Sequence, residues 1–213
     1  MKVGVLGSGD VGQALARGFA SRGHDAKVGS RKPEKLEAFV TEAKGKVSAG
    51  SFEQAARHGE VLVLATQGAS TDAAIDLAGP RHFDGKLVID VTNPLDFSKG
   101  PPPGLFVGTT DSLAERIQRK LPKAKVVKCF NIVSNVQMVD PQLPGGPPDM
   151  MICGNDEGAK QSVADIVRSF GWPEPIDVGG IDGARWLEAL VPLWARIALP
   201  RNNWKIAFKV LGR

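Results

Sequence analysis

The chain alternates short apolar runs with longer stretches in which apolar residues recur at every third or fourth position. The first pattern is typical of buried strands and the second of amphipathic helices. The runs predict strands over residues 3–6, 26–29, 46–49, 61–65, 86–91 and 125–130. The periodic stretches predict helices over residues 11–22, 32–44, 51–58, 71–78 and 112–121. This alternation favours an α/β fold with a parallel, doubly wound sheet of strand order 3-2-1-4-5-6.

Local signals place some of the boundaries. Ser51 is followed three residues later by Gln54, and Ser112 by Glu115, so each serine is predicted to cap the helix that begins after it. Residues 96–110 include three successive prolines and are predicted to form a long surface loop.

Beyond residue 140 the pattern changes. Residues 140–149 are rich in proline and glycine, so we place a domain boundary there, between residues 1–140 and a small C-terminal domain of residues 149–213. This α+β appendix is predicted to contain strands 150–153 and 174–178, helices 156–170 and 182–199, and an extended tail or final strand over 204–210. Its long helix is expected to kink at Pro192. The helix is also expected to bury a stripe formed by Trp186, Leu190, Leu193, Trp194 and Ile197.

A glycine motif lies between the first predicted strand and the first predicted helix. Gly7, Gly9 and Gly12 have the Gly-x-Gly-x-x-Gly spacing. Gly7 would make the tight turn, Gly9 would let the backbone approach a pyrophosphate, and Gly12 would let the helix pack closely on the strand. The motif, in this setting, predicts a Rossmann dinucleotide-binding domain.

The end of the second predicted strand indicates which dinucleotide binds. NAD enzymes use a carboxylate there for the ribose 2′-hydroxyl, but here Ser30 and Arg31 are followed by Lys35. A serine hydroxyl and basic side chains suit a 2′-phosphate, so we predict NADP(H). One alternative stays open, because Glu34 lies nearby and could bind a ribose hydroxyl in another geometry.

Composition and charge exclude several classes of partner and of protein. The formal net charge of +4 is spread along the chain, so neither a nucleic-acid partner nor a membrane partner is expected. No apolar stretch is long enough to span a bilayer, and a strand that starts near residue 2 leaves no room for a signal peptide. Cys129 and Cys153 lie in apolar runs and are predicted to be reduced and buried. A cytoplasmic protein is therefore expected.

The predicted strand ends carry neutral polar groups. His24, His58 and His82 precede strands and are expected at the surface, on the opposite rim. The chain has no tyrosine, which excludes dehydrogenases that use a Tyr-Lys pair. We therefore predict no catalytic acid or base and no metal site. The site would align two partners for hydride transfer.

Six segments together resemble the NADPH-dependent coenzyme F420 reductase family, which is related to the cytoplasmic reductase domain of the STEAP metalloreductases. They are residues 7–12, 28–35, 90–95, 125–131, 153–156 and 177–188. The resemblance implies hydride transfer between NADP(H) and a deazaflavin or flavin (FMN or FAD). It also implies that Ser30, Arg31 and Lys35 face the 2′-phosphate. The predicted cofactor-binding residues are Gly7, Ser8, Gly9, Asp10, Val11, Gly12, Ser30, Arg31, Lys35, Thr66, Gln67, Asn93, Pro94 and Asn131.

The acceptor stays open at this point, because archaeal members of the family carry a histidine where this chain has Asn131. Coenzyme F420, a flavin and a small carbonyl compound are all compatible with the sequence. The alternatives are an NADPH-dependent β-hydroxyacid or imine reductase and a non-catalytic NADPH-binding sensor. A homodimer is expected, because the final helix and the tail carry more apolar residues than a small appendix buries.

Overall fold

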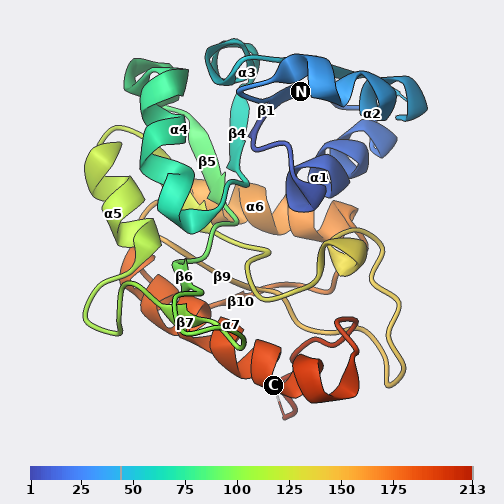
Figure 1. Ribbon diagram of the computed structural model, residues 1–213, viewed down its shortest axis with the longest axis vertical. Coiled ribbons are helices and arrows are strands. Elements are labelled where there is room, and N and C mark those ends of the chain that lie inside the picture. Colours follow the sequence, from blue (N-terminus) through green and yellow to red (C-terminus); the bar gives the residue numbers. More distant parts are fainter. Residues whose placement is uncertain (44, 213) are drawn as a thin grey trace.

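In the computed structural model, which describes residues 1–43 and 45–212, eight strands form one sheet of order β10-β9-β8-β5-β4-β1-β2-β3 (Figure 1). The strands are β1 (Lys2–Leu6), β2 (Asp25–Gly29), β3 (Val47–Gly50), β4 (Val61–Leu64), β5 (Leu87–Asp90), β8 (Lys125–Lys128), β9 (Met151–Gly154) and β10 (Ile176–Asp177). The longer helices are α1 (Asp10–Ser21), α2 (Glu37–Glu42), α3 (Phe52–His58), α4 (Thr71–Ala78), α5 (Leu113–Lys120), α6 (Glu157–Ser169) and α7 (Ala184–Ala198).

The first six strands of this sheet confirm the predicted order. β3, β2, β1, β4, β5 and β8 are neighbours in that sequence and all pair in parallel. Because the strands point the same way, the loops that follow β1, β2, β4, β5 and β8 meet at one edge of the sheet. The fold is thus a doubly wound Rossmann sheet.

The C-terminal segment extends the same sheet. β9 pairs antiparallel with β8, and β10 pairs parallel with β9. Strands on both sides of residues 140–149 are therefore hydrogen-bonded in one sheet, and the division into two domains at that stretch stays a prediction. The predicted loop 96–110 also holds part of a short antiparallel pair, β6 (Leu95–Asp96) with β7 (Gly104–Leu105).

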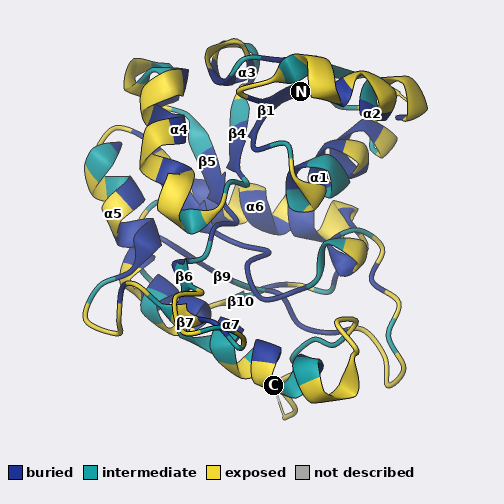
Figure 2. Ribbon diagram, viewed as in Figure 1, coloured by how far each residue is buried: buried dark blue, intermediate teal, exposed yellow. Residues whose placement is uncertain are grey.

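Each face of the sheet has its own apolar core (Figure 2). Val63 and Ile89 point into the core that contains α1, α2 and α6, whereas Leu62 and Val88 point into the core that contains α3, α4, α5 and α7. This alternation follows from the two-residue period of a strand. It explains why β4 is apolar at every position.

Helix starts agree with the capping signals. Ser51 accepts a hydrogen bond from the Gln54 N–H, and the Gln54 side chain accepts one from the Ser51 N–H, which completes a capping box. Ser112 caps α5 by accepting a hydrogen bond from the Glu115 N–H, but the Glu115 side chain accepts from the Ser112 hydroxyl, so no capping box forms there. The helix predicted over 32–44 consists of a 3-10 turn, Pro33–Leu36, followed by α2, and Lys44 lies outside the described residues.

The prediction for the buried face of α7 is wrong. Trp186 is 63% exposed and Leu193 is 48% exposed, while Leu187, Val191 and Ala195 are buried. Leu190, Trp194 and Ile197 are only partly buried. The helix is apolar on nearly all sides, so its period could not show which side faces the sheet. The inner side is the one that includes the small residues Ala184, Ala195 and Ala198.

The residues after α7 form no strand within the described part of the chain. Part of this tail is held by hydrogen bonds. The Trp194 indole N–H donates to the Ile206 carbonyl at 2.8 Å, and the Asp149 N–H donates to the Phe208 carbonyl at 3.0 Å. Pro192 lies inside α7, and the kink expected there stays a prediction. No described helix combines the length and the apolar character needed to cross a membrane.

Both cysteines are free and buried, as predicted, and they lie in different cores. Burial raises the pKa of the Cys153 thiol to about 12 and raises the pKa of Cys129 well above its ordinary value. The thiolate is the reactive form. We therefore expect neither thiol of the folded protein to react with a disulfide reagent at about pH 8, and both to react once the protein is unfolded in denaturant. If the folded protein rapidly released one equivalent of the reagent's thiolate, one of the two thiols would be reactive, and its assignment as a buried, unreactive group would be wrong.

Candidate nucleotide-binding site

A cavity of about 700 Å³ opens at the carboxyl ends of β1, β2 and β4. Eight of the predicted site residues line it: Gly7, Ser8, Gly9, Ser30, Arg31, Lys35, Thr66 and Gln67. They come from three loops that the parallel sheet brings to the same edge. This is the edge at which ligands bind in open α/β sheets.

The three motif glycines differ in what surrounds them. Gly7 has a φ of +133°, and a Cβ on it would lie 2.3 Å from the Ala65 carbonyl oxygen. A Cβ on Gly12 would lie 2.0 Å from the Gly7 carbonyl oxygen, so α1 packs directly on the turn. A Cβ on Gly9 would meet no atom within 4 Å. Gly7 and Gly12 therefore serve the fold, and Gly9 leaves space beside the cavity.

The first turn of α1 starts directly after Gly9, which lines the cavity. Asp10 and Val11 begin the helix directly after Gly9, which precedes it in extended conformation. The first N–H groups of a helix have no partner within the helix, and together they form a natural site for an anion. Asp10, Val11 and Gly12 are not among the residues that line the cavity, and their contact with a nucleotide stays a prediction.

A basic corner lies at the end of β2. The Ser8 hydroxyl donates to the Ser30 hydroxyl at 3.2 Å, and Ser30 accepts a second hydrogen bond from the Lys32 N–H at 3.1 Å. Arg31 and Lys35 are exposed, and neither forms an ion pair with another described residue. Two unpaired cations beside a fixed hydroxyl fit a doubly charged phosphate. Glu34 is not among the residues that line the cavity, which counts against its contacting a ribose there.

The loop after β4 forms another wall. The Thr66 and Thr71 hydroxyls are 3.0 Å apart, and the Thr71 hydroxyl also donates to the Gln67 carbonyl at 3.3 Å. A Cβ on Gly68 would lie 2.1 Å from the Asn93 carbonyl oxygen, so this loop packs against the loop after β5. The positions of Thr66 and Gln67 are thereby fixed relative to Asn93.

Asn93 and Asn131 form a reciprocal pair. The Asn93 amide group donates to the Asn131 backbone carbonyl at 2.8 Å, and the Asn131 amide group donates to Asn93 Oδ1 at 3.0 Å. Pro94, the residue after Asn93, is buried. The three residues lie at the ends of β5 and β8 and do not line the cavity that holds the other predicted residues.

Sequence reasoning missed part of the cavity wall. These further lining residues are Lys32, Phe52, Ala65, Ser70, Ala73, Ala74 and Leu77. Four of them come from α4 and the turn before it, at positions that share one helix face. That spacing, together with the place of α4 directly after β4, was a signal that could have identified them.

A buried lysine at the end of β8 was also missed. Lys128 Nζ lies 2.8 Å from Asp90 Oδ2 and 2.8 Å from Glu188 Oε1, and it also donates to the Thr92 carbonyl. All three side chains are at most 2% exposed. Burial lowers the pKa of Lys128, but the two carboxylates outweigh burial and raise that pKa above its ordinary value. A lysine within an apolar run was the signal for this ion triad.

The carboxylates of the triad have further partners. Glu188 accepts from the Leu113 N–H at 2.9 Å and from the Ala114 N–H at 3.1 Å, at the start of α5. Asp90 accepts from the Thr92 N–H at 2.9 Å and from its hydroxyl at 2.6 Å. The triad therefore ties α7 and α5 to the strand ends that carry Asn93 and Asn131.

The histidines lie elsewhere. His58 Nε2 is 3.3 Å from Asp25 Oδ1, and His82 Nε2 is 3.5 Å from Glu53 Oε1. Burial and then the N-terminal ammonium group lower the pKa of His24. None of the three lines the cavity at the strand ends, but all three are partly buried, whereas they were expected at the surface.

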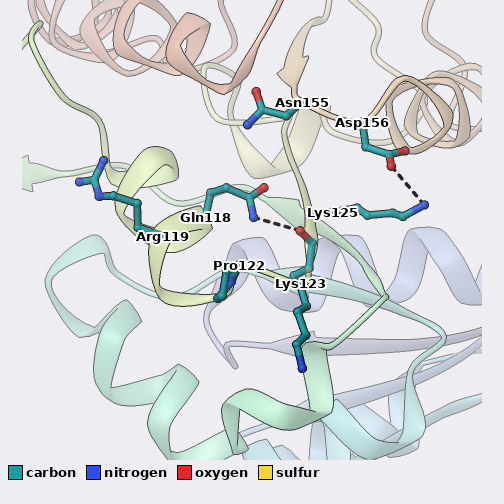
Figure 3. A pocket seen from close by; sticks show the side chains of 8 residues that line it. Gln118, Arg119, Pro122, Lys123, Lys125, Asn155 and Asp156 are labelled. Atoms are coloured by element: carbon teal, nitrogen blue, oxygen red, sulfur yellow. Dashed lines mark hydrogen bonds and ion pairs between the residues drawn. The ribbon is translucent and has the colours of Figure 1, made fainter.

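A second cavity, of about 500 Å³, lies between the end of α5, the start of β8 and the start of α6 (Figure 3). Its polar side chains have partners within the protein, some inside the lining and some outside it, such as Asp111 for Arg119 and Asp84 for Lys123. Lys125 pairs with Asp156 at 3.2 Å, and the Gln118 amide group donates to the Ala124 carbonyl at 3.0 Å. The cavity contains none of the predicted site residues.

Comparison with known proteins places the chain among redox enzymes. A family model described as NADP oxidoreductase, coenzyme F420-dependent, matches residues 2–94. The F420-dependent NADP reductase of Methanocaldococcus jannaschii is 32% identical over 204 residues, which cover 91% of this chain and 90% of that protein. The metalloreductase STEAP3 of Rattus norvegicus is 31% identical over 91% of this chain, and the match covers 38% of its length.

A solved structure agrees with these relatives. The crystal structure of a candidate F420-dependent NADP reductase from Arthrobacter sp. FB24 is 40% identical in sequence to this chain. The match covers 99% of each of the two chains, and they superimpose with a TM-score of 0.94. The Rossmann sheet, the cavity at its strand ends and these similarities define an NADP-dependent oxidoreductase. Within that class, the chain belongs to the F420-dependent NADP oxidoreductase family.

Proposed function

We propose that the protein transfers hydride between NADP(H) and a deazaflavin such as coenzyme F420. The observation that carries the proposal is the arrangement of the strand ends. A basic nucleotide cavity lies over β1, β2 and β4, and neutral amides continue the same edge over β5 and β8. The names of two relatives, the reductases of Methanocaldococcus jannaschii and Methanothermobacter marburgensis, support F420 as the second cofactor.

The residues present fit NADP(H). The space at Gly9 and the amides at the start of α1 would take the pyrophosphate, and Ser30, Arg31 and Lys35 would take the 2′-phosphate. Thr66, Gln67 and Asn93 would lie toward the nicotinamide. When bound, this cofactor supplies a hydride donor or acceptor.

The chain's own contribution is alignment. The Asn93–Asn131 pair and the packed loops hold neutral groups in fixed positions, and no histidine lines the cavity. Hydride transfer between two rings needs proximity and orientation more than proton transfer. We therefore propose that no side chain acts as an acid or base in this reaction.

The test is anaerobic mixing of the purified protein with NADPH and, separately, with coenzyme F420, FMN and FAD. Loss of absorbance of the oxidised acceptor is followed, and each reaction is repeated with NADH. Rapid, NADPH-selective bleaching of F420 is the expected result. If only FMN or FAD were reduced, the proposed acceptor would be a flavin and not a deazaflavin. Tight NADPH binding without turnover would favour the sensor or a reductase of a small carbonyl or imine compound.

Arg31→Ala tests the basic corner. Losing a charge-assisted contact to the 2′-phosphate should weaken NADPH binding by about 1.5–3 kcal/mol and leave NADH binding nearly unchanged. Titration calorimetry with both nucleotides measures the difference. Arg57→Ala is the matched control, because Arg57 is exposed, pairs with Glu53 and does not line the cavity. Equal losses for NADPH and NADH would refute the assignment.

We further propose that residues 149–213 complete the acceptor side of the site and form the surface of a homodimer. The exposed side of α7 supports this proposal, because Trp186 and Leu193 lie there near partly buried apolar neighbours. Trp186→Glu should convert a dimer to a monomer in sedimentation equilibrium.

Since both thiols are free, we place the reaction in a reducing compartment such as the cytoplasm.

A further inference from the structure

The buried triad of Asp90, Lys128 and Glu188 takes no part in the proposed hydride transfer. All three side chains are at most 2% exposed. Moving charges out of water costs free energy, and apolar residues of similar volume in the place of a buried triad often stabilise a protein equally well. What apolar residues could not replace are the contacts that these three side chains make with the backbone.

One set of contacts holds the loop after β5. Asp90 Oδ1 accepts from the Thr92 N–H at 2.9 Å and from the Thr92 hydroxyl at 2.6 Å, and Lys128 donates to the Thr92 carbonyl. Every polar group of Thr92 is thus bound to the triad, and the residue is 2% exposed. Because Asn93 follows directly, the position of its backbone is restricted as well.

A second set of contacts holds the start of α5. Glu188 accepts from the Leu113 N–H at 2.9 Å and from the Ala114 N–H at 3.1 Å. The first N–H groups of a helix have no partner within the helix, so this carboxylate satisfies two of them. The place of Leu113 relative to the end of β8 is thereby set through Glu188 and Lys128.

The two sets of contacts meet behind the loop after β4. A Cβ on Gly68 would lie 2.1 Å from the Asn93 carbonyl oxygen and 3.1 Å from Leu113 Cδ2. Gly68 directly follows Thr66 and Gln67, which line the nucleotide cavity. This part of the cavity wall is therefore backed by two residues that the triad holds in place.

We propose that Glu188 is a positioning residue for nucleotide binding, which together with Lys128 and Asp90 holds the loop after β4 in the arrangement that the nucleotide requires. This inference rests on the proposed function, because it takes the cavity to be the place where NADP(H) binds. Glu188 lies on α7 and does not itself line the cavity. The C-terminal segment thus affects nucleotide affinity without touching the nucleotide.

The experiment compares wild type with the triple variant Asp90→Asn, Lys128→Met, Glu188→Gln. The three substitutions remove the charges together with little change in volume, so no buried charge is left without its partner. Titration calorimetry measures binding of NADP⁺ and of adenosine 2′,5′-bisphosphate, a fragment that has the 2′-phosphate and lacks the nicotinamide. Urea denaturation shows that the variant is folded under the conditions of the titration.

The triple variant should bind NADP⁺ about tenfold more weakly. A loop that adopts the binding arrangement for only about a tenth of the time lowers the apparent affinity by that factor. Binding of the fragment should be unchanged, because the basic corner at Ser30, Arg31 and Lys35 would hold it. A change in stability alone would not alter the affinity of the folded protein. Unchanged NADP⁺ affinity, or equal losses for NADP⁺ and the fragment, would overturn the proposal.

Lys160→Met combined with Asp177→Asn is the matched control. The Lys160 side chain is 7% exposed and its Nζ lies 2.7 Å from Asp177 Oδ2, but neither residue lines the cavity. This variant should bind NADP⁺ as wild type does, even if it is less stable. A tenfold loss of NADP⁺ affinity in the control as well would overturn the proposal.

Two features keep the outcome decisive. Should the triple variant fail to fold, Glu188→Gln alone is measured; it keeps the pair of Lys128 with Asp90 and should show the same selective loss of NADP⁺ affinity. Absence of that loss would overturn the proposal. Since only binding is measured, absence of F420 turnover would count against the proposed function and leave this measurement readable.

Discussion

Replacing Gly9 by valine is expected to abolish binding of both NADPH and NADH while the protein stays folded. Gly9 has extended backbone angles that any residue adopts, and a Cβ there meets no atom within 4 Å. The free protein therefore has room for the new side chain. A bound pyrophosphate would need the same room, so we expect affinity to fall by about 1000-fold or more, or about 4 kcal/mol.

Calorimetry with each nucleotide measures the loss, and circular dichroism with thermal unfolding checks the fold. Gly12→Ala is the contrasting variant, because its Cβ would lie 2.0 Å from the Gly7 carbonyl oxygen and would strain the protein even without ligand. Gly12→Ala should lower the melting temperature, and Gly9→Val should not. Nucleotide binding retained by Gly9→Val would mean that the pyrophosphate lies elsewhere.

Lys128→Met is expected to be strongly destabilising. The substitution conserves much of the side-chain volume but leaves Asp90 and Glu188 as two buried carboxylates without their shared cation. Removing one partner of a buried ion pair typically costs about 3–5 kcal/mol of unfolding free energy. Burial lowers the pKa of Lys128, and the two carboxylates raise it by more, so the environment favours the charged lysine.

Urea denaturation of both proteins measures this difference. Lys123→Met is the matched control, because Lys123 is paired with Asp84 at 3.4 Å but its side chain is 75% exposed. An exposed pair is worth about 1 kcal/mol or less. If the two lysine variants were equally stable, the buried triad would not stabilise the fold as its geometry indicates.

The nucleotide-binding half of the fold could be predicted because its signals are local. A glycine spacing, a strand that ends before it and a capping pair such as Ser51 and Gln54 each depend on residues that are close in the sequence. The same holds for the basic corner, since Ser30, Arg31 and Lys35 follow one strand. The structure brings these residues into one cavity. Their contacts with a nucleotide stay predictions.

The parts that could not be predicted depend on distant partners. Lys128 meets Glu188 sixty residues later in the chain, and no pattern within the run 125–130 indicates that meeting. The antiparallel pairing of β9 with β8 likewise depends on which strand lies next to β9 in the folded sheet, and the residues of β9 alone do not indicate that neighbour. For α7, Trp186 and Leu187 are both apolar, and only the packing of the whole molecule decides which one faces inward.

The ion triad has a consequence for recombining this chain with its relatives. Asp90 and Lys128 belong to the strands that form the nucleotide half, whereas Glu188 belongs to the segment that we associate with the acceptor. A chimaera joined between residues 131 and 150 would inherit the lysine from one parent and the second carboxylate from the other. Such a graft should fold only when the donor segment brings a carboxylate at the position of Glu188, or when all three residues are exchanged together.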